Sequence, residues 1–394
     1  MVIVGAGVTG MFTTYYLLKD GHAVTLIDRA ALAQTSIFNA GFITPSFAAA
    51  PTIGMSTILL ACLGRRGPVY ISPLEVLRNI RWFRIASKKG LRGYEDVVMS
   101  LGRESLALYE DFFKSESVET ELVRGVMGIH LSEDDARKAA AISNGRFVDK
   151  AEAHQMGFKN VGGGVFFADE LCVNPAKLFS ELRRKLTELG AEIIIGKEAE
   201  LELNQDRIVS IRTDRQKIAG DCYVVTAGSW SREICKHTGY DPQILPGRGL
   251  TISFETGGER IVDVPAILED YGIAVTQNCE TTLRLTGFFE MVNFKGHFGS
   301  SRKRWLLDVA KNHLVGYDKL RYANEGVGYR PCTPDQMPVI GMVPNFRNLY
   351  IASGHCRLGL TLAPASGRII RGMITGTAVA GKLWNYFDPA RFVP

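Results

Sequence analysis

The feature that most constrains this chain is a glycine motif close to its N-terminus. Residues 2–4 are Val-Ile-Val, which predicts a buried parallel strand, and Gly5, Gly7 and Gly10 follow at the spacing G-x-G-x-x-G. The first glycine permits a tight turn, the second lets the backbone approach a pyrophosphate, and the third lets the next helix pack closely on the strand. A helical pattern over residues 11–19 then directs N–H donors toward the phosphates. The segment predicts a dinucleotide-binding α/β domain.

A second strand and a terminal acid complete this pattern. Residues 22–27 read as a strand, and Asp28 follows at its end, where a carboxylate can accept the ribose hydroxyls of an adenosine. We expect dinucleotide contacts from Gly5, Gly7, Val8, Thr9, Gly10, Asp28 and Arg29. NAD and FAD share this motif, so it does not distinguish them.

The segment after the second strand narrows the choice of cofactor. Residues 35–43 are mostly small and polar, where NAD-dependent dehydrogenases continue into a third parallel strand. Such a segment suits further pyrophosphate contacts and passage beneath a flat ring. The expected contacts are Thr35, Ser36, Asn39, Ala40 and Gly41.

Composition excludes several classes of protein. A chain of 394 residues with 46% hydrophobic and 22% charged residues is typical of a globular protein of about two domains. Its net charge of +5 is modest and its basic clusters are short, so no nucleic-acid partner is expected. The seven cysteines include no C-x-x-C pair, which predicts neither a disulfide framework nor a metal cluster and favours a reducing compartment.

The apolar segments bear on location. The chain opens directly on its first strand, which leaves no room for a signal peptide, so a cytoplasmic location is expected. No stretch has the roughly 18 apolar residues of a transmembrane helix. The apolar run 53–63, followed by Arg65 and Arg66, has the composition of a segment that lies on the cytoplasmic face of a membrane. A buried or active-site-covering helix is the favoured alternative.

Three separated segments resemble the flavin amine oxidoreductases of the D-amino acid oxidase superfamily, and most closely the D-amino acid dehydrogenases. The first segment is 2–46 and the second is 271–294, which contains Leu-Arg-Leu-Thr-Gly-Phe-Phe-Glu. The third and most specific runs from Gly-Tyr-Arg-Pro at 328–331 to Gly359. Within it, Cys356 and Arg357 are bulkier than the small residues that the family more often has there.

The resemblance implies noncovalent FAD, because Cys332 does not match the attached cysteine of related sarcosine oxidases. Near the second half of the chain it implies cofactor contacts from Ala199, Ala227, Gly228, Trp230, Arg330, Gly354, His355, Leu358, Gly359, Leu360 and Thr361. A helix over 360–374 would point its N-terminus at the flavin, where its dipole stabilises negative charge on the reduced ring.

The resemblance also implies an α/β fold with a Rossmann-like, glutathione-reductase-like FAD-binding domain and an inserted α+β substrate domain. Strand-like runs between 250 and 285 predict an antiparallel sheet in the insertion. The expected discontinuous FAD domain comprises 1–85, 145–240 and 325–394, and the substrate domain comprises 86–144 and 241–324.

Arg330 is the leading candidate for a substrate contact. In the superfamily the arginine of the matching Gly-x-Arg-Pro stretch binds the carboxylate of an amino acid, and a planar guanidinium suits that bidentate task. Arg248 is a weaker second candidate. Tyr271 and Glu290 are candidates to line the pocket, with a structural role as the alternative for each, and His355 is expected to position groups rather than act as a base.

The implied reaction is oxidative deamination of a D-amino acid, D-proline included, by hydride transfer from Cα–H to flavin N5, with electrons passed to a quinone or a dye. Such dye-linked dehydrogenases serve amino acid catabolism. One alternative is an oxidase of the same superfamily, acting on glycine, sarcosine or a D-amino acid and using oxygen. Another is a non-catalytic electron-transfer flavoprotein. The sequence leaves the oligomeric state open, with a homo-oligomer as one option.

Overall fold

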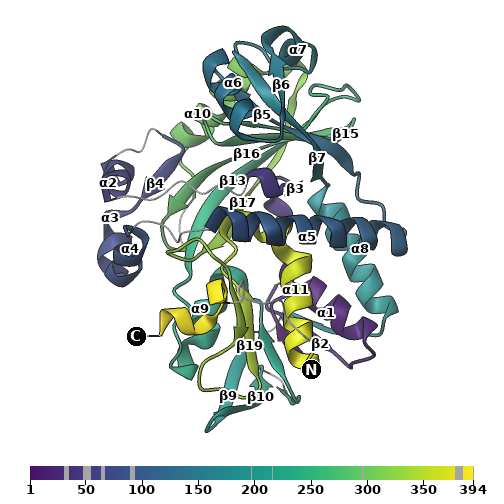
Figure 1. Ribbon diagram of the computed structural model, residues 1–394, viewed down its shortest axis with the longest axis vertical. Helices are drawn as coiled ribbons and strands as arrows, with labels where there is room; N and C mark the ends of the chain where they lie inside the picture. The colour runs from purple at the N-terminus through teal and green to yellow at the C-terminus, as the bar shows by residue number, and fades with distance from the viewer. Residues whose placement is uncertain are drawn as a thin grey trace.

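The computed structural model describes residues 1–30, 35–47, 55–63, 67–88, 94–196, 198–214, 216–294, 297–377 and 385–393. Two large β-sheets form two lobes stacked along the long axis of the molecule (Figure 1). The long helix α5 (Tyr94–Ser115) crosses between the lobes. No described helix is long and apolar enough to cross a membrane.

The lower lobe is built on a six-stranded sheet with the strand order β18-β19-β12-β1-β2-β8. Its strands are parallel except for the pair β18/β19. Their bounds are β1 Val2–Val4, β2 Thr25–Asp28, β8 Glu192–Ile195, β12 Tyr223–Val225, β18 Val339–Met342 and β19 Leu349–Ser353. A small antiparallel sheet adjoins it, made of β9 Glu200–Asn204, β10 Arg207–Arg212 and β11 Lys217–Ile218.

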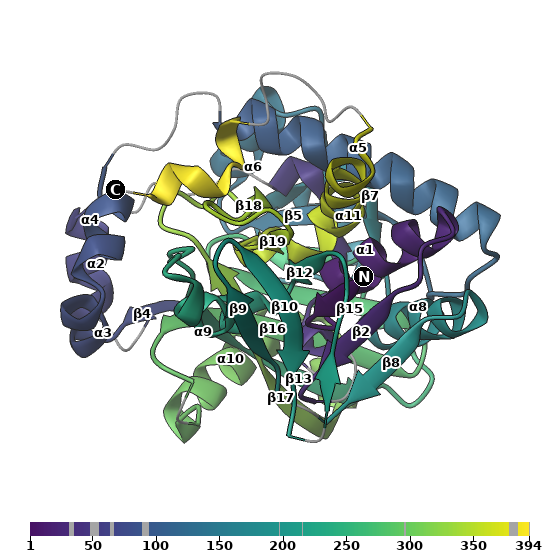
Figure 2. The same ribbon diagram turned by 90° about the horizontal axis from the view of Figure 1, so that it is seen from below.

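Helices α1 (Val8–Lys19), α8 (Pro175–Glu188) and α11 (Gly359–Thr375) pack together against the six-stranded sheet (Figure 2). Helix α5 joins this layer, because the Phe12 ring meets the Tyr109 ring edge-on at 5.2 Å. The Tyr109 hydroxyl also donates to the carbonyl oxygen of Leu360 at 2.8 Å. A core of aromatic and aliphatic side chains therefore stabilises the lower lobe.

The upper lobe is a mixed, mainly antiparallel sheet with the order β17-β13-β16-β15-β14-β5-β7-β3, flanked by β4 and β6. The antiparallel pairing of β13, β15 and β16 confirms the sheet expected there. The bounds are β3 Phe42–Ile43, β4 Val69–Ile71, β5 Val123–His130, β6 Arg146–Asp149, β7 Gly163–Cys172, β13 Leu245–Glu255, β14 Ala266–Leu268, β15 Ile273–Cys279, β16 Thr282–Met291 and β17 Arg321–Cys332.

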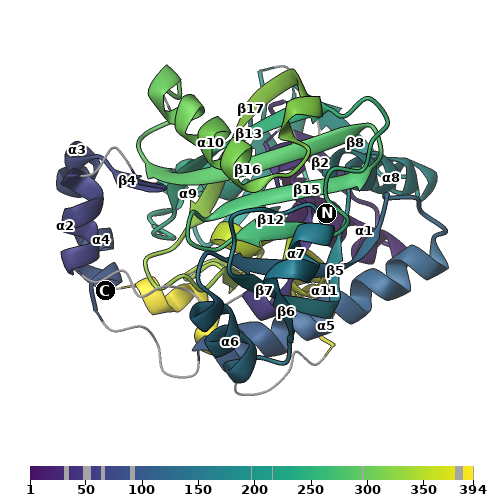
Figure 3. The ribbon, with the colours of Figure 1, turned by 90° about the horizontal axis from the view of Figure 1, so that it is seen from above.

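Helices α6 (Glu133–Ile142), α7 (Lys150–Gln155) and α10 (Ser300–His313) lie around the upper sheet (Figure 3). The short helices α2 (Met55–Leu63), α3 (Pro73–Arg78) and α4 (Ile80–Ala86) gather in one projecting corner, visible in all three views (Figures 1–3). Helix α9 (Ser231–Cys235) follows β12.

The sheets divide the chain differently from the expected domain ranges. Strands β6 and β7 lie within the range 145–240 assigned to the FAD domain, yet both belong to the upper sheet, where β7 pairs with β5 along seven registered positions. Conversely, α5 lies in the range assigned to the substrate domain, yet it packs on α11 and its Tyr109 and Phe112 rings contact Phe12 of α1. These assignments depend on long-range strand pairing and helix packing, which local patterns do not encode.

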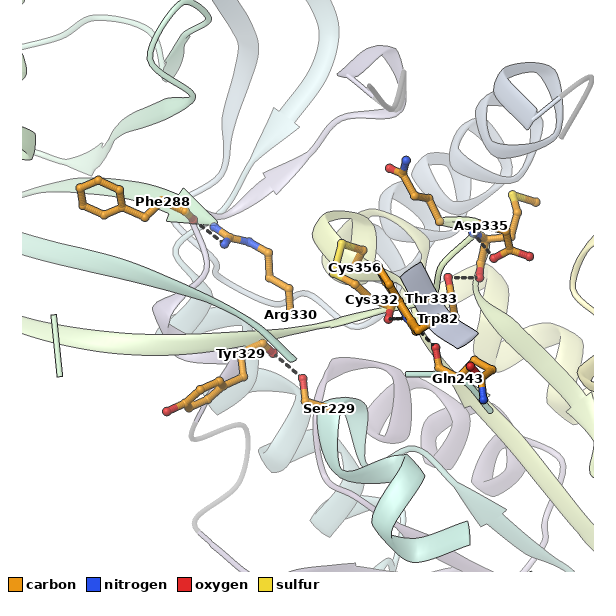
Figure 4. Close-up of a disulfide and its surroundings, with 12 residues drawn as sticks. Trp82, Ser229, Gln243, Phe288, Tyr329, Arg330, Cys332, Thr333, Asp335 and Cys356 are labelled. Atoms are coloured by element: carbon orange, nitrogen blue, oxygen red, sulfur yellow. Dashed lines mark hydrogen bonds between the residues drawn. A yellow bond between two sulfur atoms is a disulfide. The ribbon is translucent and has the colours of Figure 1, made fainter. Parts of the chain in front are cut away.

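One cysteine expectation is wrong. Cys332, at the end of β17, forms a disulfide with Cys356, whose Cα atom lies 4.3 Å away (Figure 4). The two cysteines are 24 residues apart, so they form no short cysteine motif in the sequence. Only the fold brings them together. The remaining described cysteines are free thiols.

Candidate active site

The glycine turn between β1 and α1 forms one wall of a cavity of about 480 Å³. Gly5 adopts a φ of +111°, and a Cβ atom at Gly10 would lie 2.0 Å from the Gly5 carbonyl oxygen. By contrast, a Cβ atom at Gly7 would meet nothing closer than 3.6 Å, so the backbone there is open to the cavity. Gly5 and Gly10 therefore shape the turn, while Gly7 leaves room for a ligand.

Asp28 lies on the wall of this cavity with its carboxylate held by two backbone groups. Oδ2 accepts from the Ala6 amide at 2.7 Å and Oδ1 accepts from the Ala30 amide at 3.0 Å. Each carboxylate oxygen retains acceptor capacity for a ribose hydroxyl. The other predicted residues lining this cavity are Gly5, Gly7, Val8, Thr9, Arg29, Thr35, Ser36, Ala199, Ala227, Gly228, Trp230, His355 and Gly359.

Trp230 belongs to a stack of rings on this wall. The Arg29 guanidinium lies 4.2 Å from the centre of the Trp230 ring, and the Phe294 ring stacks on the indole at 4.7 Å. Sequence reasoning missed Phe294, which stacks on Trp230, and three acidic lining residues, Glu198, Glu200 and Glu233. The three glutamates carry no motif, and only the fold brings them to the cavity.

A second cavity, of about 910 Å³, adjoins the first and lies between the lobes. Both cavities share wall residues, among them Val8, Thr35, Ser36 and Gly359. Further predicted residues on its wall are Asn39, Ala40, Arg330, Leu358, Leu360 and Thr361. The continuous space fits an extended ligand with a nucleotide at one end and a ring system at the other.

Three predicted residues support the walls from outside the cavities. Gly41 and Gly354 have φ values of +94° and +82°, and Gly10 packs on Gly5. A Cβ atom at Gly41 would lie 2.1 Å from the Val173 carbonyl oxygen, so these glycines permit close backbone packing.

Arg330 extends from β17 into the larger cavity, where protein surrounds its guanidinium (Figure 4). Its Nη1 donates to the carbonyl oxygen of Phe288 at 2.8 Å. Burial, and then repulsion from Arg357, lower the pKa of Arg330 to about 10, so it remains a cation at neutral pH. A Cβ atom at Gly249 would lie 2.6 Å from Nη1, so this glycine makes space for the guanidinium.

A bulge in β16 aims the Phe288 carbonyl at Arg330. The register shifts so that Phe288 and Phe289 lie opposite the single residue Gly249 of β13, and Phe288 has a φ of +69°. A non-glycine residue in this region costs about 1–3 kcal/mol and persists where the surroundings impose it. The bulge re-aims one backbone group toward the cavity.

Glu290 and Arg248 do not line the larger cavity. The Glu290 carboxylate accepts hydrogen bonds from Nε of Arg248 and from Nε of Arg302, each at 2.8 Å, and all three side chains are buried. The expected pocket contacts are instead an internal ion-pair cluster, because the strand ends and α10 bring these charges together.

Tyr271 likewise faces away from the cavity. Its hydroxyl lies 3.2 Å from Nε2 of His313, and its ring packs against Trp305. The turn between β14 and β15 directs it to the α10 side of the sheet. The sequence suggested Tyr271 as a pocket residue, whereas Glu269, two positions earlier, is the one that lines the cavity.

His355 is buried beneath the smaller cavity. Its Nε2 lies 2.8 Å from Ser366 Oγ, which itself donates to the Leu362 carbonyl oxygen. The serine proton is thus occupied, so Nε2 carries the hydrogen and donates to Ser366. Burial lowers the pKa of His355 to about 4, so the ring is neutral at physiological pH and suited to positioning.

Several charged residues of the larger cavity were not predicted as substrate contacts, namely Glu95, Asp96, Arg103, Glu269 and Arg357. Glu269 and Arg357 both line the larger cavity, and both side chains are exposed to its solvent. Burial raises the pKa of Glu269 to about 7, against the lowering effect of Arg357. Arg357 had a sequence signal, as a bulky departure from the family loop, whereas Glu269 had none.

A glycine turn at a helix N-terminus, a ribose-binding acid and an adjoining cavity with a half-buried arginine define a dinucleotide-dependent oxidoreductase of the α/β class. The open backbone at Gly7 and the shared walls of the two cavities fit FAD in an extended form. The chain belongs to the DAO family of FAD-dependent oxidoreductases, whose model matches residues 1–373. FAD is therefore its cofactor, and the predicted fold and superfamily are confirmed.

Known proteins resemble this chain over nearly its full length. A D-amino acid dehydrogenase of Azorhizobium caulinodans is 27% identical over 95% of this chain and 96% of its own. Glycine oxidase from Bacillus cereus has the same fold, with a TM-score of 0.77, 17% identity and 98% coverage of each chain. L-Proline dehydrogenase from P. horikoshii gives a TM-score of 0.78 at 16% identity, covering 99% of this chain and 96% of that one.

Proposed function

We propose that this protein is an FAD-dependent dehydrogenase of D-amino acids, with D-proline among its candidate substrates. The observation that carries the proposal is Arg330, a half-buried cation on the wall of the larger cavity, anchored by the Phe288 carbonyl. The D-amino acid dehydrogenase of Azorhizobium caulinodans supports the choice of substrate.

In the proposed reaction Arg330 binds the substrate carboxylate through the N–H groups that Phe288 does not use. A guanidinium holds a carboxylate with two parallel hydrogen bonds, which fixes the orientation of the attached Cα–H. Gly249 keeps the space that this arrangement needs. Bound FAD supplies the hydride acceptor, and a quinone or dye takes the electrons onward.

Glu269 is the residue we propose to face the amino group. Its carboxylate lies on the same cavity wall as Arg330 and Arg357, so the site offers both signs of charge to a zwitterion. With a pKa raised to about 7, Glu269 is suited to accept a proton from the substrate ammonium group. His355 is a weak base, because burial lowers its pKa to about 4, and its Nε2 is engaged with Ser366.

The test is anaerobic reduction of the purified protein's flavin by D- and L-amino acids, including both prolines. Bleaching of the oxidised flavin band by D-isomers supports the proposal, and a flavin that no amino acid reduces contradicts it. Turnover with a dye under nitrogen and the absence of peroxide in air indicate a dehydrogenase. Rapid peroxide formation in air would instead indicate an oxidase.

An Arg330→Lys variant tests the role of the guanidinium. Loss of the bidentate contact should lower kcat/KM roughly a hundredfold, because hydrogen bonds to charged groups contribute about 1.5–3 kcal/mol. The flavin spectrum should remain. Arg304→Lys, at an exposed position on α10, is the matched control and should behave as wild type.

A further inference from the structure

The corner formed by α2, α3 and α4 exposes an unusual density of aliphatic side chains. Of fifteen large apolar side chains that are exposed among the described residues, six fall between positions 59 and 80. They are Leu59, Leu60, Val69, Leu74, Leu77 and Ile80, with exposed fractions from 40% to 69%. We call these six residues the apolar corner. Contiguous exposed apolar surface marks an interaction site.

The opposite faces of the same helices are well packed, so the apolar corner is not the result of a missing core. Ile58, Ala61, Trp82 and Phe83 are buried in one cluster with Met291. The Trp82 indole Nε1 donates to the carbonyl oxygens of Gln243, at 3.0 Å, and Cys332, at 3.2 Å (Figure 4). The helices are thus anchored to the rest of the protein through their buried faces, and their exposed leucines lie on the opposite faces.

Charge is concentrated in the same part of the chain. Residues 51–89 contain seven Lys and Arg and one Glu, a net charge of +6, whereas the whole chain carries +5. The rest of the protein is therefore close to neutral. Arg78, Arg81, Arg84 and Lys88, all in the described part, are exposed next to the apolar corner.

We propose that the apolar corner docks on an anionic lipid membrane. Aliphatic side chains enter the boundary between headgroups and acyl chains, while Lys and Arg beside them bind anionic headgroups, a combination that peripheral membrane proteins use. Helix α2 has nine residues, too few to cross a bilayer, so it lies on the surface.

Other partners fit less well. A second copy of this chain, packed symmetrically on the apolar corner, would bring the exposed Arg81, Arg84 and Lys88 of both copies together, and these like charges repel. A nucleic acid would neutralise the arginines but leave the leucines in water. An anionic membrane satisfies both features.

The test is sedimentation of the intact flavoprotein with vesicles of phosphatidylcholine alone or mixed equally with phosphatidylglycerol. We expect binding to the mixed vesicles only, weakened by salt because the attraction is screened. Leu60→Glu/Leu77→Glu and Arg84→Glu/Lys88→Glu should each lower the partition coefficient about tenfold or more. The controls are Val209→Glu, an exposed aliphatic position on β10, and Lys150→Glu, an exposed basic position on α7.

Several results would overturn the proposal. The proposal is wrong if wild-type protein stays in the supernatant or binds both vesicle types equally. It is also wrong if wild-type protein binds no more tightly than the corner variants. Light scattering without vesicles distinguishes self-association, since corner variants that convert an oligomer to a monomer would indicate a protein interface instead. The variants must keep the flavin spectrum and melting temperature of wild type. Binding to vesicles requires no substrate, so this inference and the proposed function can fail separately.

Discussion

The Nη1 atom of Arg330 donates to the carbonyl oxygen of Phe288 at 2.8 Å, joining the end of β17 to a bulge in β16. This contact restricts the guanidinium to one side of the larger cavity before any substrate arrives. A site held in place in this way loses less conformational entropy on binding than a mobile arginine would.

Gly249→Ala should weaken substrate binding without unfolding the protein. The added Cβ would lie 2.6 Å from Arg330 Nη1 and push the guanidinium away from Phe288. We expect KM to rise about tenfold, the cost of one hydrogen bond to a charged group. Steady-state kinetics with the best D-amino acid will measure this. Gly299→Ala, whose Cβ would meet nothing closer than 3.9 Å, should leave KM unchanged.

Glu269 should make substrate binding depend on pH near neutrality. Burial raises its pKa from 4.5 to about 7, so the carboxylate ionises across this range. Wild-type KM should change through about pH 7, and the Glu269→Gln variant should lose that step. A variant with the wild-type profile would contradict this role.

The same pKa shift predicts an effect on stability. Because the folded pKa is raised, the folded state holds the proton more firmly than the unfolded chain does. The penalty for ionised Glu269 is absent below pH 4.5 and grows as the pH rises through about 7. Because Glu269 is exposed to solvent, which screens the penalty, Glu269→Gln should raise the melting temperature only slightly at alkaline pH and leave it unchanged in acid. Thermal unfolding at both pH values will show this.

Glu290→Gln should destabilise the fold. The change leaves Arg248 and Arg302 buried together without their carboxylate, and breaking a buried ion pair costs about 3–5 kcal/mol. Calorimetry should show a lower melting temperature, while Glu255→Gln, at an exposed position on β13, should not change it. Weaker substrate binding at unchanged stability would instead place Glu290 in the pocket.

Reduction of the Cys332–Cys356 disulfide should lower stability. The bond closes a loop of 24 residues, for which the chain-entropy model gives about 3 kcal/mol. A phosphine reductant should lower the melting temperature of wild type. It should have no further effect on the Cys332→Ser/Cys356→Ser variant, whereas Cys279→Ser, which removes a free thiol, should respond like wild type.

Features formed within short stretches were predictable. The strand, glycine turn, helix and acid over residues 2–28 depend on neighbours in the chain, and their geometry follows from local backbone sterics and hydrogen bonding. The helix after Gly359 and the position of Arg330 in front of the flavin-binding segment were predictable in the same way, since each lies in one continuous motif.

Only the tertiary structure decided the rest, because those features depend on contacts between distant parts of the chain. Glu269 and Tyr271 share one turn, yet the first lines the cavity and the second packs toward α10. Cys332 meets Cys356 only once β17 and the segment before α11 lie side by side. Glu290 binds two arginines because β13, β16 and α10 converge there. The sequence determined the class of cofactor site through local geometry, and the packing of separate elements decided which charged side chains face the substrate cavity.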